Sequence, residues 1–282
     1  MGMKRLFNRK LVSVTGEGAI PFLQGLAAQD MTLLTSKKAV GAIFLNPKGR
    51  LLCDAIVVRT DDGVMLDVPA AHHEMMATML TRHKLRLPVQ VDKMTELAVH
   101  YVTHGSGDLG QDVVAFSDPR SSYLPERCLV PSPPDNGDDL TEALDYRKER
   151  LMAGIVEAND MPADSIPIFY NFDLFNCVSF NKGCYTGQEL VTRTLRRGIV
   201  RKRAVPLVRA DGVDVVVGQK VSINGVDVGT VFAACGNVGQ AVVQMGDQLN
   251  EKAQFCAAIA KIDQVTLDGT AAKILIPKYC IG

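Results

Sequence analysis

The chain has 282 residues, of which 47% are hydrophobic and 22% are charged, and its 31 basic and 31 acidic side chains give a formal net charge of zero. This length suffices for two or three packed units with a substantial core. A balanced charge argues against a dedicated nucleic-acid-binding protein, which would present a basic field. Because no apolar run approaches the roughly 18 residues of a spanning helix, we expect no membrane partner either.

The N-terminal segment is basic, with Lys4, Arg5, Arg9 and Lys10 and no acidic residue. Such a segment is typical of either a very short mitochondrial targeting sequence or a basic tail before the first strand. It lacks the apolar run of a secretory signal. A first strand is expected to begin by Leu11.

Short strands and helices follow one another through the first half of the chain. Strands are expected over residues 11–15, 39–45, 50–59, 64–68, 97–102 and 112–116. Helices are expected around Pro21, from Pro69, and over residues 140–152 with an end at Gly154. Residues 46–49 read as a four-residue turn and residues 131–139 as a polar, proline-rich loop. Strands before and between helices, without regular βαβ alternation, indicate an α+β fold.

The character of the sequence changes after Gly198, where short β-type runs predominate. Strands are expected over residues 199–208, 213–217, 220–223, 226–232, 240–245, 257–262 and 272–276. Asn224-Gly225 between two such runs is a strong hairpin signal. Short strands at this spacing predict a small β-barrel, so we expect an α+β region over residues 1–204 and a C-terminal barrel domain over residues 205–282.

Seven cysteines are scattered along the chain without a Cys-x-x-Cys pair or a zinc-type spacing: Cys53, Cys128, Cys177, Cys184, Cys235, Cys256 and Cys280. This pattern suggests a reducing compartment with mostly buried thiols. The histidines form no metal-ligand pattern, and the methionines of residues 75–79 recur at helical spacing. The histidines are interpreted as structural or surface residues, and the methionines as core filler rather than ligands.

The stretch from Ser179 to Leu190 concentrates chemically active residue types. Cys184 lies between Gly183 and Gly187, with Lys182 two residues before it and Gln188 and Glu189 after it. The glycines allow a tight bend, and a helix is expected to follow. A helix N-terminus and a nearby ammonium both favour thiolate over thiol, so Cys184 is a candidate reactive thiol. An inert buried cysteine in a glycine-rich turn is the alternative.

The octet Lys182-Gly183-Cys184-Tyr185-Thr186-Gly187-Gln188-Glu189 resembles the signature of the folate-binding YgfZ/Iba57 family. Further segments resemble that family in the same order: residues 22–26, residues 44–50 with Asp54, and residues 201–203 with Pro206. The resemblance covers most of residues 11–210. Beyond residue 210 only the general pattern of strands agrees.

The resemblance implies a fold and a function. The family's fold is related to the glycine-cleavage aminomethyltransferase, with subdomains, expected here to be interleaved, around a central cavity. Its members bind tetrahydrofolate or another reduced folate and assist the maturation of 4Fe–4S proteins together with an A-type scaffold protein. We therefore expect a scaffold and client 4Fe–4S proteins as partners, and a monomer on its own. The implied compartment is the mitochondrial matrix in a eukaryote and the cytoplasm in a bacterium.

Site residues follow from the motif and the resemblance together. Cys184 is expected to act as a transient cluster ligand or redox thiol, with Lys182 beside it. One cysteine cannot hold a cluster that takes about four ligands, so a partner must supply the others. The residues expected to contact folate are Asp30, Asn46, Arg50, Asp54, Gln188, Glu189 and Arg193.

A basic run follows the motif, with Arg193, Arg196, Arg197, Arg201, Lys202 and Arg203. A solvated face is the ordinary reading of such a run. Beside a folate site, arginines could clamp the glutamate carboxylates of the ligand, or they could attract an acidic partner.

The sequence also departs from the family pattern. Ile155-Val156-Glu157-Ala158 stands where relatives carry Pro-Glu-Gly, and Phe169 stands where relatives often have a glutamate. The second departure puts the affinity for folate in question. The alternative functions are a tetrahydrofolate-dependent aminomethyltransferase-like enzyme and a binding module with a structural cysteine. A non-catalytic assembly factor is favoured, because one-carbon transferases of this kind usually lack the octet.

Overall fold

The structure is a computed structural model that describes residues 2–102, 113–132, 143–246 and 248–281. The contacts divide the chain into two compact units. Unit 1 comprises Met1–Pro47, Leu52–Ala143 and Asn176–Thr186, and unit 2 comprises Lys48–Leu51, Leu144–Phe175 and Gly187–Gly282. The predicted domain boundary at residue 205 falls inside strand β10 (Lys202–Arg209) of unit 2 and stays a prediction. Among the described residues, no helix combines the length and apolar character that a membrane crossing requires.

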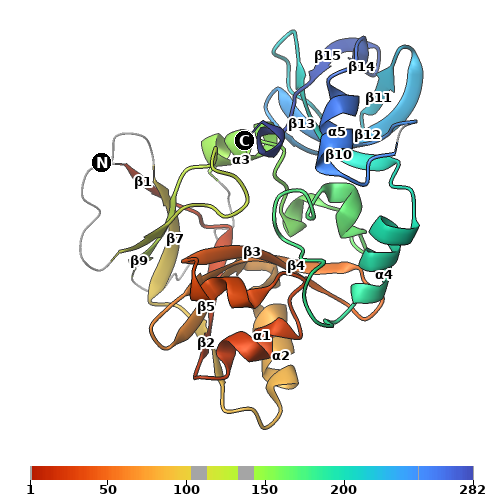
Figure 1. Cartoon of the computed structure of the whole chain (residues 1–282). Helices are drawn as coiled ribbons and strands as arrows, with labels where there is room; N and C mark the ends of the chain where they lie inside the picture. The colour runs from red at the N-terminus through yellow and green to blue at the C-terminus, as the bar shows by residue number, and fades with distance from the viewer. Residues whose placement is uncertain (1, 103–112, 133–142, 247, 282) are drawn as a thin grey trace. The chain divides into compact units, whose positions relative to one another are not determined.

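Unit 1 contains two sheets (Figure 1). A five-stranded sheet has the order β3 (Ala39–Leu45), β4 (Leu51–Arg59), β5 (Gly63–Pro69), β2 (Arg9–Thr15) and β6 (Gln90–Met94). A four-stranded sheet has the order β1 (Met3–Arg5), β7 (Leu97–Val102), β9 (Arg127–Pro131) and β8 (Val114–Phe116). The helices are α1 (Ala19–Gln24) and α2 (His73–Lys84), with 3-10 turns at Met31–Thr35 and Ala70–His72.

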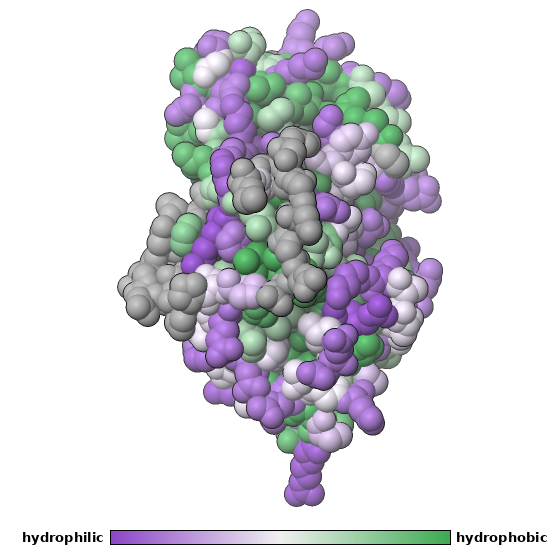
Figure 2. All heavy atoms as spheres, turned by 90° about the vertical axis from the view of Figure 1, so that its left-hand side faces the viewer, coloured by the Kyte–Doolittle hydropathy of each residue, from purple (hydrophilic) through white to green (hydrophobic). Residues whose placement is uncertain are grey.

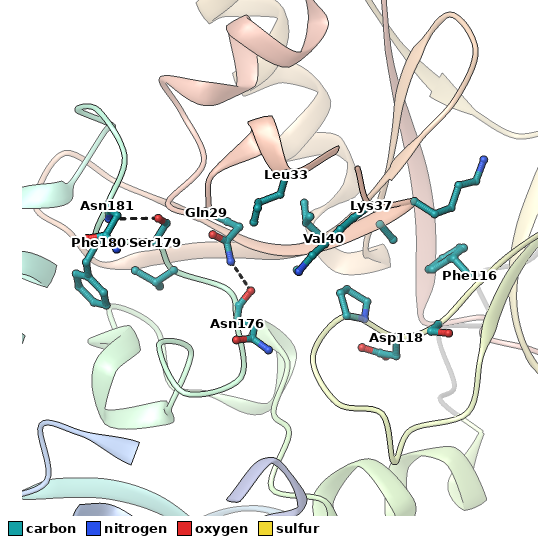
Figure 3. Close-up of a pocket in the computed structure, with 16 residues that line it drawn as sticks. Gln29, Leu33, Lys37, Val40, Phe116, Asp118, Asn176, Ser179, Phe180 and Asn181 are labelled. Atoms are coloured by element: carbon teal, nitrogen blue, oxygen red, sulfur yellow. Dashed lines mark hydrogen bonds between the residues drawn. The ribbon is translucent and has the colours of Figure 1, made fainter. Parts of the chain in front are cut away.

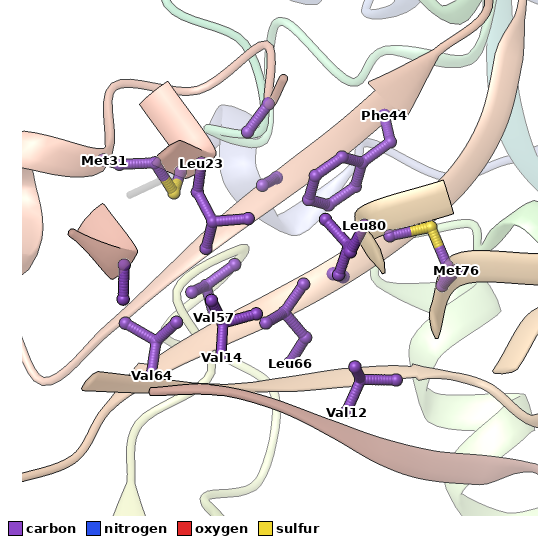
Figure 4. Close-up of a cluster of buried hydrophobic side chains, with 14 of the residues drawn as sticks. Val12, Val14, Leu23, Met31, Phe44, Val57, Val64, Leu66, Met76 and Leu80 are labelled. Carbon is purple, nitrogen blue, oxygen red and sulfur yellow. The ribbon is translucent and has the colours of Figure 1, made fainter. Parts of the chain in front are cut away.

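The core of unit 1 lies between the five-stranded sheet and its helices (Figure 4). Alternate residues of β2 and β5, such as Val12 and Leu66, point into it because side chains of a strand alternate between faces. Met76 and Leu80 of α2 are fully buried against them, four residues apart on one helix face. This confirms the interpretation of the methionines as core residues.

A buried chain of charges connects the two sheets of unit 1. Arg9 of β2 donates to Asp67 of β5 at 2.6 Å and to Asp54 of β4 at 3.1 Å. The Asp67 carboxylate also pairs with Arg127 of β9, in the other sheet, and Arg127 lies 3.4 Å from Asp118. All these side chains are buried. Removing any one member would leave an uncompensated charge in the core. These buried ion pairs therefore connect the five-stranded sheet to the four-stranded sheet.

The basic N-terminal residues belong to this fold. Lys4 and Arg5 lie in β1, which pairs with β7, and Arg9 is buried in the charge chain. The expectation of a basic tail before the first strand is therefore wrong for these residues. Two other predicted features, the proline-rich loop and the start of the helix at residue 140, lie mostly outside the described residues, as does His104.

Unit 2 contains a closed barrel, as expected, with the strand order β10, β13 (Val238–Gln244), β12 (Val226–Cys235), β11 (Lys220–Ile223), β14 (Val265–Leu267) and β15 (Thr270–Ile274). Its helices are α3 (Leu144–Met152), α4 (Gln188–Thr192), a π-helical turn at Arg193–Arg197 and α5 (Lys252–Ile259). Its 3-10 turns lie at Ala158–Asp160, Pro167–Tyr170 and Lys278–Cys280. The predicted hairpin is confirmed, since Asn224 and Gly225 have φ values of 52° and 79°, both positive as a type I′ turn requires.

Several elements differ from expectation. Residues 257–262 were predicted as a strand, but residues 257–259 lie in α5 and residues 260–262 form no strand. In α5, Phe255, Ala258 and Ile259 are buried at helical spacing, and Glu251 and Gln254 form a capping box. Short apolar runs cannot be assigned to helix or strand by pattern alone, and the cap was the missed signal. Residues 213–217 form no strand. Strands β1, β6, β9 and β14 were not anticipated.

Two cysteines also correct an expectation. Cys256 of α5 and Cys280 of the C-terminal turn form a disulfide, with Cα atoms 6.0 Å apart. The pairing could not be deduced from a separation of 24 residues, because it depends on the docking of the C-terminal turn against α5. This disulfide departs from the expectation of a reducing compartment with mostly buried thiols.

Arg203 was expected in an exposed basic run, but it is fully buried in unit 2. Its guanidinium donates to Asp173 at 2.6 and 2.9 Å, to the Ile168 carbonyl at 2.7 Å and to the Leu249 carbonyl at 2.9 and 3.1 Å. The neighbouring Arg201 is exposed. Arg201 precedes β10 and Lys202 begins it, both exposed, whereas the strand is buried from Arg203 to Leu207, so one basic run contributes both to the surface and to the core.

This difference predicts unequal stability effects. Arg203→Leu should lower the free energy of unfolding by about 3–5 kcal/mol, because the buried Asp173 carboxylate would lose its partner. Arg201→Leu, the matched control, should change it by less than about 0.5 kcal/mol. Urea titrations of both variants measure the difference. Equal effects would show that the buried ion pair does not contribute as described.

Candidate functional site

Residues 176–186 carry the first part of the motif and are fastened to the segment after α1. The Ser179 amide donates to the Ala28 carbonyl at 3.0 Å, and the Thr186 amide donates to the Gly25 carbonyl at 3.1 Å. These two bonds flank Cys184 on either side. The motif segment is thus anchored by hydrogen bonds to residues about 150 positions earlier in the chain.

Lys182 connects the middle of the motif segment to residues 24–29. Its ammonium donates to the carbonyls of Gln24, Ala27 and Gln29 at 2.7, 2.8 and 2.8 Å. Burial lowers the pKa of Lys182 to about 8, against the opposing charge of Asp30. An ammonium has three N–H donors, and all three are directed at carbonyls. Lys182 therefore positions the loop rather than donating a proton to Cys184.

Cys184 is presented at the surface by this fastened loop. It is exposed, whereas the free thiols of Cys53, Cys128 and Cys177 are buried and that of Cys235 is half-buried. Burial raises the pKa of Cys128 to about 11. Thiols of that kind remain protonated and inert near neutral pH. Among the cysteines of the described chain, Cys184 is the thiol that a partner or reagent can reach directly.

Tyr185, the next residue, is buried. The Lys182 ammonium lies 5.3 Å from the centre of its ring, within the range of a cation–π contact. Its hydroxyl is buried and has no hydrogen-bond partner in the part of the chain that the structure describes. Burial raises the pKa of Tyr185 to about 12, so the group is a neutral hydroxyl. A buried hydroxyl without a partner is costly, and a ligand or water that bonded it would recover that cost.

The second part of the motif, from Gly187 onward, belongs to unit 2 and packs against the turn of residues 46–49 at Gly49. A Cβ atom at Gly49 would lie 2.8 Å from the Gly187 carbonyl oxygen and 2.5 Å from the Leu190 Cβ. Both glycines have positive φ, 75° and 78°. The Asn-Pro-Lys-Gly turn and the Gly-Gln-Glu segment thus pack backbone against backbone, which only glycine permits.

Three residues expected to contact folate lie in unit 1. Asp54 is buried and paired with Arg9, so its carboxylate belongs to the core. Desolvation tends to raise the pKa of Asp30, but hydrogen bonds from Thr32 and Gln24 lower it overall, and the side chain caps the turn at Met31–Thr35. Asn46 is half-buried after β3.

The other four expected folate residues lie in unit 2. Arg50 donates to the Asp164 carbonyl at 3.2 Å. Gln188 is half-buried, and Glu189 and Arg193 are exposed and form a loose i,i+4 pair at 3.8 Å. An exposed pair of this kind contributes little to stability, so both side chains are available to a ligand or partner.

Unit 1 also contains a pocket of about 710 Å³, within the range of small-molecule sites (Figure 3). Gln29 bridges it to the motif segment, since its side-chain amide donates to the Asn176 carbonyl at 2.6 Å. The lining includes Gln29, Leu33, Lys37, Val40, Phe116, Asp118, Asn176, Ser179, Phe180 and Asn181. The sequence did not indicate this pocket, because its walls come from separate segments. The positive φ of Asn176, 62°, was the one local anomaly there.

A self-sufficient metal centre is not found. Across the described ranges, no group of three or more His, Cys, Asp or Glu side chains could hold a metal ion. Ring nitrogens of His73 and His83 lie 2.9 and 2.8 Å from the carbonyl oxygens of Leu11 and Met79, contacts that are structural. A metal or cluster at Cys184 would need ligands from another molecule.

The role of Lys182 can be tested directly. Lys182→Met should lower the free energy of unfolding by about 1–3 kcal/mol, because three carbonyls lose their donor. Hydrogen exchange at the Ser179 and Thr186 amides should become faster, whereas Lys37→Met, an exposed control in unit 1, should leave both unchanged. Unaltered exchange in Lys182→Met would show that the ammonium does not hold the segment.

Comparison with known proteins identifies relatives. No family model matches the chain. The human iron–sulfur cluster assembly factor IBA57, mitochondrial, is 31% identical over 277 residues, covering 85% of this chain and 76% of that protein. The IBA57 homologue of Coccidioides immitis is also 31% identical, covering 73% of this chain. The chain spans 56% of that fungal protein and 58% of the one from Pyricularia oryzae.

A solved structure shares the fold. The glycine cleavage system aminomethyltransferase T of Bartonella henselae matches 98% of this chain and 85% of its own, with a TM-score of 0.71 at 20% identity. The predicted aminomethyltransferase-like α+β fold with a C-terminal barrel is confirmed. Since the human relative exceeds 30% identity and the chain covers three quarters of it, the chain belongs to the IBA57 family of iron–sulfur cluster assembly factors.

Proposed function

We propose that this protein is an iron–sulfur cluster assembly factor in which Cys184 supplies one thiolate to a cluster shared with a partner. The observation that carries the proposal is an exposed thiol on a loop that Lys182 fastens through three hydrogen bonds. A fixed loop presents the sulfur at little entropic cost on binding. Membership of the IBA57 family supports the same role.

The chemistry requires a second molecule. On coordination the Cys184 thiol loses its proton to solvent, and the thiolate sulfur donates a lone pair to iron. A cluster takes about four ligands, and the described residues provide no other cysteine at this surface. An A-type scaffold with two or three cysteines would complete the coordination, and 4Fe–4S client proteins would receive the cluster.

Exposed arginines could guide such a partner. Arg193, Arg196 and Arg201 are exposed in unit 2, whereas Arg203 is buried and cannot contact a partner. Charges of one sign accelerate the encounter with an acidic surface. The effect should weaken with salt, since exposed charges are screened beyond about 8 Å at physiological ionic strength.

Folate binding is proposed in a revised form. The amide-lined pocket of unit 1 suits a ligand with paired donors and acceptors, such as a pterin. The unpartnered Tyr185 hydroxyl, which does not line that pocket, is a separate candidate contact. On unit 2, Arg50 and Arg193 are proposed on their own to pair with glutamate carboxylates of a folate. Asp54 does not fit, because its carboxylate is neutralised in the core. A bound folate would supply one-carbon chemistry, and the residues of this chain would bind and orient it.

A one-carbon transferase is the second candidate, favoured by the aminomethyltransferase fold alone. The relatives are named assembly factors, which favours the non-catalytic function. Turnover of tetrahydrofolate with an aminomethyl donor would distinguish the two. The names of the relatives place those proteins in mitochondria, and we propose the mitochondrial matrix for this chain in a eukaryote and the cytoplasm in a bacterium.

The shared-cluster mechanism predicts a complex with defined requirements. The protein and a cluster-loaded A-type scaffold should co-elute at low salt, with cluster absorbance in the shared peak. Cys184→Ser should remove that absorbance and retain association, while Cys235→Ser, the control at a half-buried free thiol, should retain both. Arg193→Glu with Arg201→Glu should weaken association itself. A stable cluster on this protein alone, or no complex at any salt concentration, would contradict the mechanism.

Folate binding predicts a measurable affinity. Calorimetry with tetrahydrofolate should give a dissociation constant in the micromolar range, about −8 kcal/mol. Arg50→Ala should weaken binding by roughly tenfold through the loss of a charged hydrogen bond, and Arg86→Ala, exposed elsewhere in the chain, should not. No heat at millimolar ligand would show that this chain lacks the site, with Phe169 as the first residue to replace by glutamate.

A further inference from the structure

The loop after α2 exposes two large apolar side chains at its tip. Leu85 is 84% exposed and Leu87 is 49% exposed, and Leu85 is the most exposed large hydrophobic residue in the described part of the chain. The loop lies at the lower end of α2 in Figure 1. At the same height in Figure 2, hydrophobic and hydrophilic residues lie side by side. Isolated exposed leucines are ordinary, so the surroundings decide whether this pair has a role.

The loop has a fixed shape. The Leu87 amide donates to the Lys84 carbonyl at 2.8 Å, and the Val89 amide donates to the Leu87 carbonyl at 2.8 Å. The Lys84 ammonium closes the loop by donating to the Val89 carbonyl at 3.1 Å. Val89 itself is buried in the core. The leucines are therefore held outward by hydrogen bonds and by an anchored stem.

Leu85 also occupies an unfavourable backbone conformation. Its φ is 47° and its ψ is −112°, a region that branched side chains rarely adopt. Glycine or asparagine would fit there with less strain. A leucine at this position costs stability through backbone strain and gains none through burial. Strain of this kind concentrates at functional sites.

Basic residues flank the leucines in the sequence. Residues 75–91 contain Arg82, Lys84 and Arg86 and no acidic residue. Arg82 and Arg86 are exposed, and neither guanidinium has a hydrogen-bond or ion-pair partner within the described ranges. The turn at Gly16, which packs against Pro88, carries the acidic Glu17, and Asp92 lines one groove together with Lys84 and Pro88. Of the arginine and lysine side chains at the end of α2 and the tip of the loop, Arg82 and Arg86 are the exposed ones.

We propose that this loop docks on an anionic phospholipid surface. Leu85 and Leu87 would enter the boundary between headgroups and acyl chains, and Arg82 and Arg86 would bind headgroup phosphates while their aliphatic stems stay near the leucines. A projecting tip fits a deformable apolar phase better than a flat protein surface. The expectation of no membrane partner rested on the lack of a spanning run, which does not bear on a surface loop.

The chain contains no tryptophan, so a single one can report on the loop. Leu85→Trp should show a blue-shifted emission with vesicles of phosphatidylcholine and phosphatidylserine and no shift with phosphatidylcholine alone. Val217→Trp is the control, since Val217 is 58% exposed in unit 2. Its emission should not change with either vesicle. An unshifted emission of Leu85→Trp with anionic vesicles at low salt would overturn the proposal.

Vesicle flotation of the intact protein measures the contributions of the leucines and of the arginines to membrane binding separately. Leu85→Asn with Leu87→Asn should reduce binding by about tenfold for each leucine, while Val216→Asn with Val217→Asn should not. Arg82→Gln with Arg86→Gln should reduce it by roughly fivefold for each arginine. Lys37→Gln with Lys38→Gln is the charge control. If wild-type protein ignores vesicles but is retained on immobilised polyglutamate in a Leu85-dependent manner, the loop binds an acidic protein and the lipid proposal is wrong.

Discussion

Three hydrogen bonds from one ammonium determine what the candidate site can do. Lys182 directs all its donors at carbonyls of residues 24–29, and this fixes the loop on which Cys184 is exposed. Lys182 was expected to favour the thiolate form of Cys184, but its ammonium instead holds the loop in place. The cost of burying the charge is offset by three acceptors in good geometry, and the result is an accessible sulfur on a rigid support. The reactivity of Cys184 then depends on what approaches it.

Buried charge has a similar organising role elsewhere. In unit 1, Arg9, Asp67 and Arg127 join two sheets, and in unit 2, Arg203 and Asp173 join the barrel to the turn at Pro167–Tyr170. Such pairs contribute little net stability compared with apolar packing, but they discriminate strongly against misalignment. Removing one arginine from either set would leave an uncompensated buried carboxylate, so neither arginine can be replaced alone by an aliphatic side chain without a loss of stability.

The local features of the fold were predictable from the sequence, and the long-range ones were not. Strands 39–45 and 97–102 are visible as short runs rich in apolar and β-branched residues, and the Asn224-Gly225 hairpin is visible in its turn chemistry; all three were placed correctly. The octet of residues 182–189 also identified Cys184 correctly as the exposed cysteine, because its residues are contiguous in the sequence. The partners of Lys182 lie more than 150 residues away, and the burial of Arg203 and Asp54 depends on which strand face meets the core. Helix α5 was misread because five apolar residues fit either period.

The contact between Gly49 and Gly187 has a consequence for how this protein can change over time. A side chain at Gly49 would collide with the backbone at Gly187 and with Leu190, 138 and 141 positions further along the chain. Because this collision involves the carbonyl oxygen of Gly187, no change of side chain in the Gly-Gln-Glu segment can make room for one at Gly49. The two motifs that carry the family resemblance are therefore constrained as one unit, and glycine is required at both positions for as long as the two segments pack together.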